Sequence, residues 1–256
     1  MDSEDIVYKK DDGIAKIIIN RPKVYNAFRT NTLKEMCIAL EDAELDPDIR
    51  VIVIRGEGDK AFCTGGDASE SESGGYNRDM DYWHTKCHHL LRAITKPVIA
   101  AVNGWAIGGG HIIHVICDLS IAADTAKFGQ AGPRVGSFDG GFAAAYLSRI
   151  VGEKKAREIW FLCRTYSAQE ALEMGLVNKV VPLADLDAEV EKWCKEIIEL
   201  GPTALKFLKA AFNADTDHVF GFDTMSQAAV RLYWESDEAK HYKEMFMNKR
   251  KEKKGT

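Results

Sequence analysis

The chain has 256 residues, of which 46% are hydrophobic, so it is long enough to bury one sizeable core. Its net charge of −5 and its isoelectric point near 5.8 leave no broad basic field for nucleic acid. Only KRKEKK (249–254) is strongly basic; we expect it to be solvated, with a phosphate or partner contact as the alternative. No apolar run approaches the ~20 residues of a membrane span, and MDSEDIVYKKDD is too polar for a signal peptide.

The six cysteines are scattered without a CxxC pair, and several lie in apolar runs. This usage is typical of reduced thiols, so we expect a cytoplasmic protein. His84 and His88 are four residues apart, which places them on one face of a predicted helix. Two imidazoles without a nearby carboxylate or a third ligand do not make a metal site, and no metal is predicted.

The first part of the chain alternates short apolar strands with helices. In chain order we expect a strand over 14–19, a helix over 33–46, a strand over 51–55, a helix around 82–94, a strand over 98–102, a helix from about 109 to 116 and a strand over 119–123. Near-continuous apolar strands that alternate with helices predict parallel sheets covered on both faces.

After Gly141 the pattern becomes mostly helical. We expect helices over 142–150, 153–163, 168–174 and 186–200, one that begins at Pro202, and two more over 222–234 and 237–248. The Gly201-Pro202 pair indicates a turn and not a linker. The prediction is therefore an α/β core over residues 1–200 and a helical region over 201–256, packed on the core or on a neighbouring subunit.

The segment FGQAGPRVGSFDGG (128–141) places Ser137 and Asp139 among five glycines. Glycines let a backbone approach a ligand closely, so the segment is typical of a reaction site. A long surface loop with turn chemistry at Asp-Gly is the alternative. Under that alternative Asp139 caps a helix beginning at Gly140, and Ser137 is a turn residue.

Two further glycine clusters each follow a predicted strand, CTGGD (63–67) and NGWAIGGGH (103–111). Amides at the start of a helix lack intrahelical acceptors and can hold an anion. Two such amides that converge from separate loops would form an oxyanion hole. Neither GxGxxG in the right register nor GxxxxGK[ST] is present, which disfavours a nucleotide-phosphate cradle.

AFCTGGD, KPVIAAVNGWAIGGGH, DLSIAAD, FGQAGPRVGS and SAQEALEMGLVNKVVP together resemble the crotonase (enoyl-CoA hydratase/isomerase) superfamily across nearly the whole chain. The resemblance implies an α/β crotonase (ClpP-like) fold, a spiral of ββα units with a helical C-terminal trimerisation region. It also implies a homo-oligomer, usually a hexamer built as a dimer of trimers, and an acyl-CoA substrate with no cofactor beyond its CoA moiety. By the resemblance, the oxyanion hole falls on Gly66 and Gly109. The CoA contacts fall on Arg29, Lys60, Ala61 and Asp67.

Two positions depart from the hydratases of the superfamily. The places of their two glutamates hold Ile112 and Gly132, so the acid and the base of a usual hydratase are missing. GPxxGSxDxG and KKAREIWFLCR instead resemble two other branches. One is 2-ketocyclohexanecarboxyl-CoA hydrolase, which opens a ring by a retro-Claisen attack of water. The other is 1,4-dihydroxy-2-naphthoyl-CoA synthase, which closes a ring by a Claisen condensation.

Ser69 and Ser71 stand where the synthase carries basic residues that hold its substrate or its CoA. A carboxylate entering a desolvated pocket needs a partner, so the loss of two cations disfavours the synthase. We therefore expect a ring-opening hydrolase of an alicyclic β-ketoacyl-CoA in anaerobic aromatic or alicyclic degradation. The synthase of menaquinone biosynthesis and a non-catalytic crotonase-fold binding protein remain the alternatives.

The resemblance also implies roles for single residues. Asp139 would be the general base for water, with Ser137 orienting it or the β-oxygen. Tyr76 matches a catalytic tyrosine of the synthase, with a plain loop aromatic as the alternative. Trp234 falls where the synthase brings in a tyrosine from a neighbouring subunit. A pocket that holds bicarbonate in one class of the synthase corresponds to Gln130, Gly132 and Trp160; here it would hold bicarbonate or another small anion, water or a substrate carboxyl, and the alternative for Trp160 is helix packing.

Overall fold

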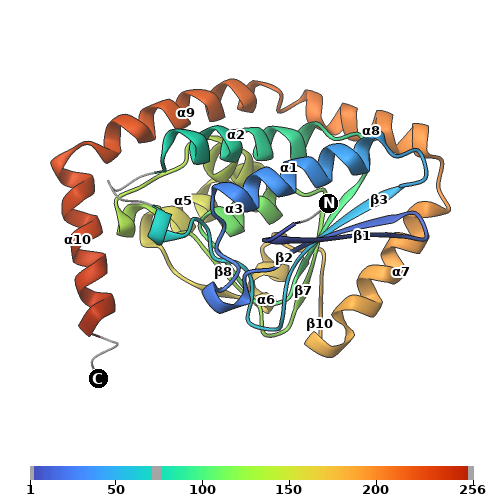
Figure 1. The fold of residues 1–256 in the computed structure, drawn as a ribbon, viewed down its shortest axis with the longest axis horizontal. Coiled ribbons are helices and arrows are strands. Elements are labelled where there is room, and N and C mark those ends of the chain that lie inside the picture. Colours follow the sequence, from blue (N-terminus) through green and yellow to red (C-terminus); the bar gives the residue numbers. More distant parts are fainter. Residues whose placement is uncertain (1–2, 71–75, 253–256) are drawn as a thin grey trace.

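The computed structural model describes residues 3–70 and 76–252, and its centre is a six-stranded sheet in the order β1-β2-β3-β5-β7-β10 (Figure 1). β1 is antiparallel to β2, and every other neighbouring pair is parallel. The strands are β1 (Ile6–Asp11), β2 (Ile14–Ile19), β3 (Val51–Gly56), β5 (Val98–Val102), β7 (Leu119–Ala123) and β10 (Lys179–Val181).

A second sheet of four very short strands lies at the ends of the connections, in the order β4-β6-β8-β9. The first three strands are parallel, and β9 is antiparallel to β8. These strands are β4 (Ala61–Cys63), β6 (Trp105–Ile107), β8 (Lys127–Gly129) and β9 (Tyr166–Ser167). Of the two glycine clusters singled out in the sequence, CTGGD begins in β4 and NGWAIGGGH contains β6, which places both on the same side of the molecule.

Both faces of the large sheet are buried, as β3 illustrates. Successive side chains of a strand point to opposite faces. Ile52 and Ile54 belong to the larger hydrophobic cluster, which includes side chains of the first three α-helices, whereas Val51 and Val53 belong to a smaller cluster with α7. In Figure 1, α1 and α2 cover one face and α7 lies against the other. The helices of the first 200 residues are α1 (Thr30–Leu45), α2 (Arg78–Ala93), α3 (Gly109–Ile116), α4 (Leu147–Val151), α5 (Glu153–Leu162), α6 (Ala168–Glu173) and α7 (Leu186–Ile198).

The chain ends in α8 (Pro202–Ala214), α9 (His218–Trp234) and α10 (Asp237–Glu252). α9 packs along α2 and against the segment that follows Asp139, while α10 turns away from the sheet (Figure 1). The expected class, α/β with parallel strands and a helical C-terminal region, is confirmed. Within the described part of the chain, no helix is long and apolar enough to cross a membrane. All six cysteine thiols are free and buried.

The structure differs from the sequence-based expectation in several places. β1, β10 and the whole small sheet were not predicted. The helix expected over 142–150 begins as a π-helix, η4 (Gly141–Tyr146), before it continues as α4. The remaining short elements are single turns of 3-10 helix: η1 (Pro22–Val24), η2 (Ala68–Glu70), η3 (Gly132–Val135) and η5 (Leu183–Asp185).

Candidate active site

Two backbone amides from separate loops approach one another beside the small sheet. Gly66 follows β4 and bridges to Phe28 through the carbonyl of Gly65 and the amide of Asp67, so its own N–H is turned away from Phe28. Gly109 is the first residue of α3, where an N–H has no intrahelical acceptor. The loops touch, since a Cβ built on Gly65 would lie 3.0 Å from the Gly109 nitrogen. The structure therefore brings together the two predicted oxyanion-hole segments.

The ring of Tyr76 lies directly against Gly66. A Cβ on Gly66 would come within 2.6 Å of a Tyr76 ring carbon and 2.8 Å of its hydroxyl oxygen, so no other residue fits here without moving the tyrosine. The ring also contacts His84 and Trp234, with centroids 5.2 and 5.3 Å away. Burial, with nearby charges that include Asp139, raises the pKa of Tyr76, so its hydroxyl stays protonated and can donate a hydrogen bond.

Asp139 is a buried carboxyl, only 8% exposed, at the start of η4. Its Oδ1 accepts hydrogen bonds from the amides of Gly141 and Ala143, at 2.9 and 3.4 Å, and its Oδ2 accepts one from Gln227 at 3.3 Å. Burial and the charge of Asp223 raise its pKa to about 7, against these hydrogen bonds. The side chain thus caps the π-helix, as one alternative predicted, and also titrates in the range of a general base.

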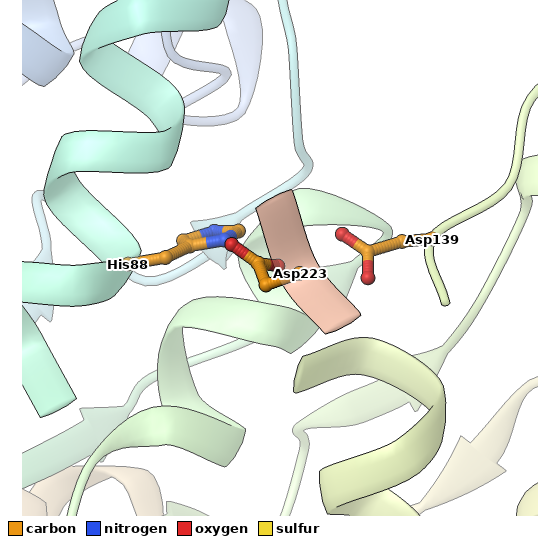
Figure 2. Close-up of side chains that lie close together, drawn as sticks. All are labelled: His88, Asp139 and Asp223. Carbon is orange, nitrogen blue, oxygen red and sulfur yellow. The ribbon is translucent and has the colours of Figure 1, made fainter. Parts of the chain in front are cut away.

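Three titratable side chains meet at this point, His88 from α2, Asp223 from α9 and Asp139 (Figure 2). Each offers one donor atom, and these atoms lie within 4.8 Å of one another. Figure 2 shows Asp223 between the other two. His88 is 1% exposed and neither ring nitrogen has a hydrogen-bond partner; burial holds its pKa well below its usual value, so it is neutral. The expectation that no carboxylate lies near His88 is wrong, because η4 and α9 bring two from distant parts of the sequence.

The close approach of α9 depends on the two glycines after Asp139. Gly141 lies against Asp223, and a Cβ there would collide with the carboxylate. The Gly140 amide donates to the Ser226 hydroxyl at 2.6 Å. Asp223 is fully buried; its Oδ2 lies 3.0 Å from His89 Nε2, and its Oδ1 has no partner. Within the described residues this is the one set of three such side chains close enough to consider for a metal, and both Asp139 oxygens already accept hydrogen bonds within the chain.

Ser137 lies in different surroundings from those of Asp139. It belongs to the wall of a cavity of about 620 Å3 between η3, α5 and α10. The cavity wall is mostly apolar and aromatic, with Phe138, Phe161, Tyr233 and Phe246, and carries the cations Arg134 and Lys249. No hydrogen bond joins the Ser137 hydroxyl to Asp139 in the described structure. The role of Ser137 as an orienting group therefore stays a prediction.

Comparison with known proteins agrees with this arrangement. Residues 9–254 match the family model described as enoyl-CoA hydratase/isomerase. The chain belongs to this family. Among solved structures it is similar to an enoyl-CoA hydratase/isomerase from Xanthobacter autotrophicus Py2, with TM-score 0.85, 29% identity, and coverage of 96% of this chain and 94% of the other. It is also similar to an enoyl-CoA hydratase from Mycobacterium avium subsp. paratuberculosis K-10 (TM-score 0.84, 26% identity, 96% and 97% covered). A probable enoyl-CoA hydratase from Mycobacterium smegmatis gives a TM-score of 0.77, 33% identity, and coverage of 90% and 93%.

The two positions where hydratases of this family would carry glutamates are apolar and tightly packed. Ile112 is 4% exposed in the hydrophobic core. A Cβ on Gly132 would come within 2.7 Å of the Ser137 carbonyl and 2.8 Å of the Trp160 ring. Gln130 is buried and donates to His111 at 3.1 Å. An anion on the Cβ side of Gly132 would therefore require Trp160 to move, and anion binding remains a prediction.

The predicted CoA-binding residues lie along one edge of the same loops. Arg29 is ion-paired with Asp5 at 2.7 Å, and Asp67 with Arg21 at 2.9 Å, so both serve bonds within the chain. Lys60 is exposed and makes no ion pair among the described side chains. Ala61 is buried at the start of β4. Of the predicted CoA contacts, Lys60 is thus the one cation without an ion pair among the described side chains, and its role in CoA binding stays a prediction.

Sequence reasoning considered His88 only as a possible metal ligand and did not identify Asp223 and Gln227. These two are polar side chains on the buried face of α9, four residues apart, which was the available signal. Trp234 was expected to act across a subunit boundary; in this chain its ring contacts Tyr76 of the same chain. Its indole nitrogen is buried without a hydrogen-bond partner.

Proposed function

We propose that the protein cleaves a C–C bond of an alicyclic β-ketoacyl-CoA with water, a retro-Claisen ring opening. The observation that carries the proposal is Asp139, a buried carboxyl with a pKa near 7. Its charge contributes to the raised pKa of Tyr76, whose ring lies against Gly66, while the two hydratase positions, Ile112 and Gly132, carry no carboxylate. An acid-base group in this place, without the hydratase pair, favours C–C chemistry on a CoA thioester.

In the first step ionised Asp139 takes a proton from water as the oxygen attacks the ring ketone. The tetrahedral alkoxide collapses, the bond from the former ketone carbon to the α-carbon breaks, and its electron pair forms the thioester enolate. The amides of Gly66 and Gly109 stabilise the enolate oxygen; the loss of one such donor typically costs about 3 kcal/mol. Tyr76, protonated and in contact with Gly66, donates the proton to the α-carbon and regains one from the new carboxylic acid, so Asp139 still holds the proton that it took from water.

The balance of protons distinguishes this reaction from its neighbours. Water and the β-ketoacyl-CoA give a carboxylic acid on the same acyl chain, and that acid ionises at neutral pH, so one proton leaves per turnover. The ring closure of a synthase consumes a proton because a carboxylate is converted to a ketone. Hydration of an enoyl-CoA neither releases nor consumes one. Proton release therefore separates the proposed chemistry from ring closure and from hydration.

The loop after Gly66 supports the hydrolase over the synthase. The Ser69 hydroxyl donates to Asp67 at 2.8 Å, so this position adds a polar group turned to a carboxylate and not a cation. Ser71, the second position of this comparison, lies outside the described residues. An anionic substrate would meet a local excess of acidic groups here.

The test incubates the purified protein with several saturated alicyclic β-ketoacyl-CoA thioesters that differ in ring size. The expected product has the mass of one added water, a new carboxylate and one proton released to an indicator dye. These substrates lack a C=C bond, so hydration cannot mimic the result. No ring opening, together with cyclisation of succinylbenzoyl-CoA or hydration of an enoyl-CoA, would overturn the proposal.

Two variants make the assay specific. Asp139→Asn is expected to lower kcat by about 10²–10⁴, the usual contribution of a general base. Asp48→Asn, which changes an exposed carboxylate on the turn after α1, is the matched control and is expected to retain wild-type kcat. In the wild type, kcat/KM should rise about tenfold per pH unit up to about pH 7, because only ionised Asp139 is active. A flat profile between pH 5 and 8 would contradict the role of Asp139.

We also propose the hexameric assembly and the place in anaerobic aromatic or alicyclic degradation that the sequence suggests. Large apolar side chains are exposed on α8 and α9, such as Phe207, Phe212 and Leu232 at 69%, 77% and 78%. Apolar surface of this kind is usually covered by another subunit. Sedimentation of the purified protein measures the assembly; a monomer would contradict it.

A further inference from the structure

In the proposed reaction the buried carboxyl of Asp139 holds a proton that it must lose before the next turnover. Each turnover releases one proton, and Asp139, which takes it from water, is only 8% exposed. A general base that cannot lose its proton stops after one cycle. The proton must therefore leave through groups that connect Asp139 to solvent.

Asp223 is placed for this transfer. It lies between Asp139 and His88 in Figure 2, with donor atoms within 4.8 Å of theirs. One of its oxygens has no partner, and the other lies 3.0 Å from His89 Nε2. The charge of Asp223 disfavours ionisation of Asp139, and a proton held by Asp139 has this neighbouring carboxyl to which it can pass.

His89 completes the route outward. Its side chain is 31% exposed, whereas that of Asp223 is fully buried. The ring is packed edge-on against Phe220, at 4.9 Å between centroids, which fixes its orientation. Imidazole can accept a proton from a carboxyl on one nitrogen and release it to water from the other.

We propose that Asp223 and His89 form the proton exit of the active site, passing the proton that Asp139 takes from water to solvent. The inference rests on the proposed hydrolysis, since that reaction produces the proton. His88 lies beside Asp223, and neither ring nitrogen of His88 has a hydrogen-bond partner. Other charged or titratable groups on the facing elements include His84, Asp81, Cys87 and Arg92 of α2, Arg231 of α9, Tyr146 of η4 and Tyr76; Asp81 and Arg231 pair with each other at 3.2 Å.

The first test removes the outer group and offers a substitute. His89→Ala is expected to lower kcat on the order of tenfold in weak buffer, with KM unchanged, because proton transfer and not binding is affected. Added imidazole should restore kcat with saturation, which the loss of a merely structural side chain would not allow. His218→Ala, an exposed histidine on the same helix as Asp223, is the control and should respond to neither change. Wild-type kcat in His89→Ala, or a loss that imidazole does not restore in a folded variant, overturns the proposal.

The second test needs no substrate and separates this inference from the proposed function. The infrared band of a protonated carboxyl that disappears in Asp139→Asn is followed with pH in the wild type and in Asp223→Asn. A lower midpoint in Asp223→Asn supports the shared proton, because the neighbouring charge is gone. An unchanged midpoint overturns it, as does a stoichiometric divalent cation that survives dialysis and is lost in Asp223→Asn. The wild type could be inactive on every ring substrate while Asp223→Asn still shows the lower midpoint. That outcome would contradict the proposed function but support the coupling of the two carboxyls.

Discussion

Replacing Asp139 with asparagine should stabilise the protein while it abolishes activity. The folded-state pKa of about 7 lies above the ordinary 3.8, so the folded protein holds this proton more tightly than the unfolded chain. The stability it contributes is complete below about pH 4 and is lost as the pH rises to about 7. At 1.36 kcal/mol per pKa unit, the full loss is about 4 kcal/mol. Asparagine never ionises and keeps an oxygen for the Gly141 amide, so it avoids this loss.

Urea unfolding at pH 5 and pH 8 measures the effect. Asp139→Asn should be more stable than the wild type by about 1–2 kcal/mol at pH 5 and by about 4 kcal/mol at pH 8, the latter an upper bound because Gln227 must reorient. Asp48→Asn, on an exposed turn, should show no gain that depends on pH. An equal difference at both pH values, or a larger destabilisation of Asp139→Asn at pH 8, would refute the assignment of a buried, proton-holding carboxyl.

Three glycine substitutions test other parts of the structure. Gly66→Ala should displace the Tyr76 ring and lower kcat by about 10²-fold with little change in melting temperature, as measured by steady-state kinetics and thermal melts; full activity would contradict the contact. Gly221→Ala, in an open position of α9, should raise stability by about 0.5–1 kcal/mol in denaturant titrations without changing kcat, and a destabilised variant would show hidden crowding. Gly132→Ala should cost about 1–3 kcal/mol because its Cβ meets Trp160, and an unaltered Trp160 fluorescence spectrum with full stability would refute this packing.

The long periodic elements could be predicted because the apolar pattern of each is contained within its own segment of the sequence. β5, α3 and β7 have the predicted bounds, since each combines a continuous apolar run with flanking glycine or polar residues. β1 was missed because IVYKKD is an edge strand whose second half is exposed and charged. The strands of the small sheet have two or three residues, too few for any period to appear.

The site could be predicted only where its residues lie in recognisable motifs at the ends of neighbouring strands. Gly66 and Gly109 follow strands of one parallel sheet, and so the convergence of their loops could be expected from the topology. Asp223 could not be assigned, because its partner is fixed by how α9 crosses η4, a packing set by Gly140, Gly141 and the Ser226 hydroxyl. The sequence marks Asp223 only as a charge on an amphipathic helix, without its distance from Asp139.

The reactivity of the six buried thiols can report on local unfolding of the protein. Thiolates are the form that reacts with alkylating reagents, and burial raises the pKa of Cys63 and Cys194 to about 12. Labelling therefore awaits an opening of the surrounding structure. Because the thiols lie in separate places, from α1 and β4 to α7, the labelling rate at each would measure how easily that region opens. The relative order of α7 and the α1–α2 layer in such an experiment would show which face of the large sheet is released first.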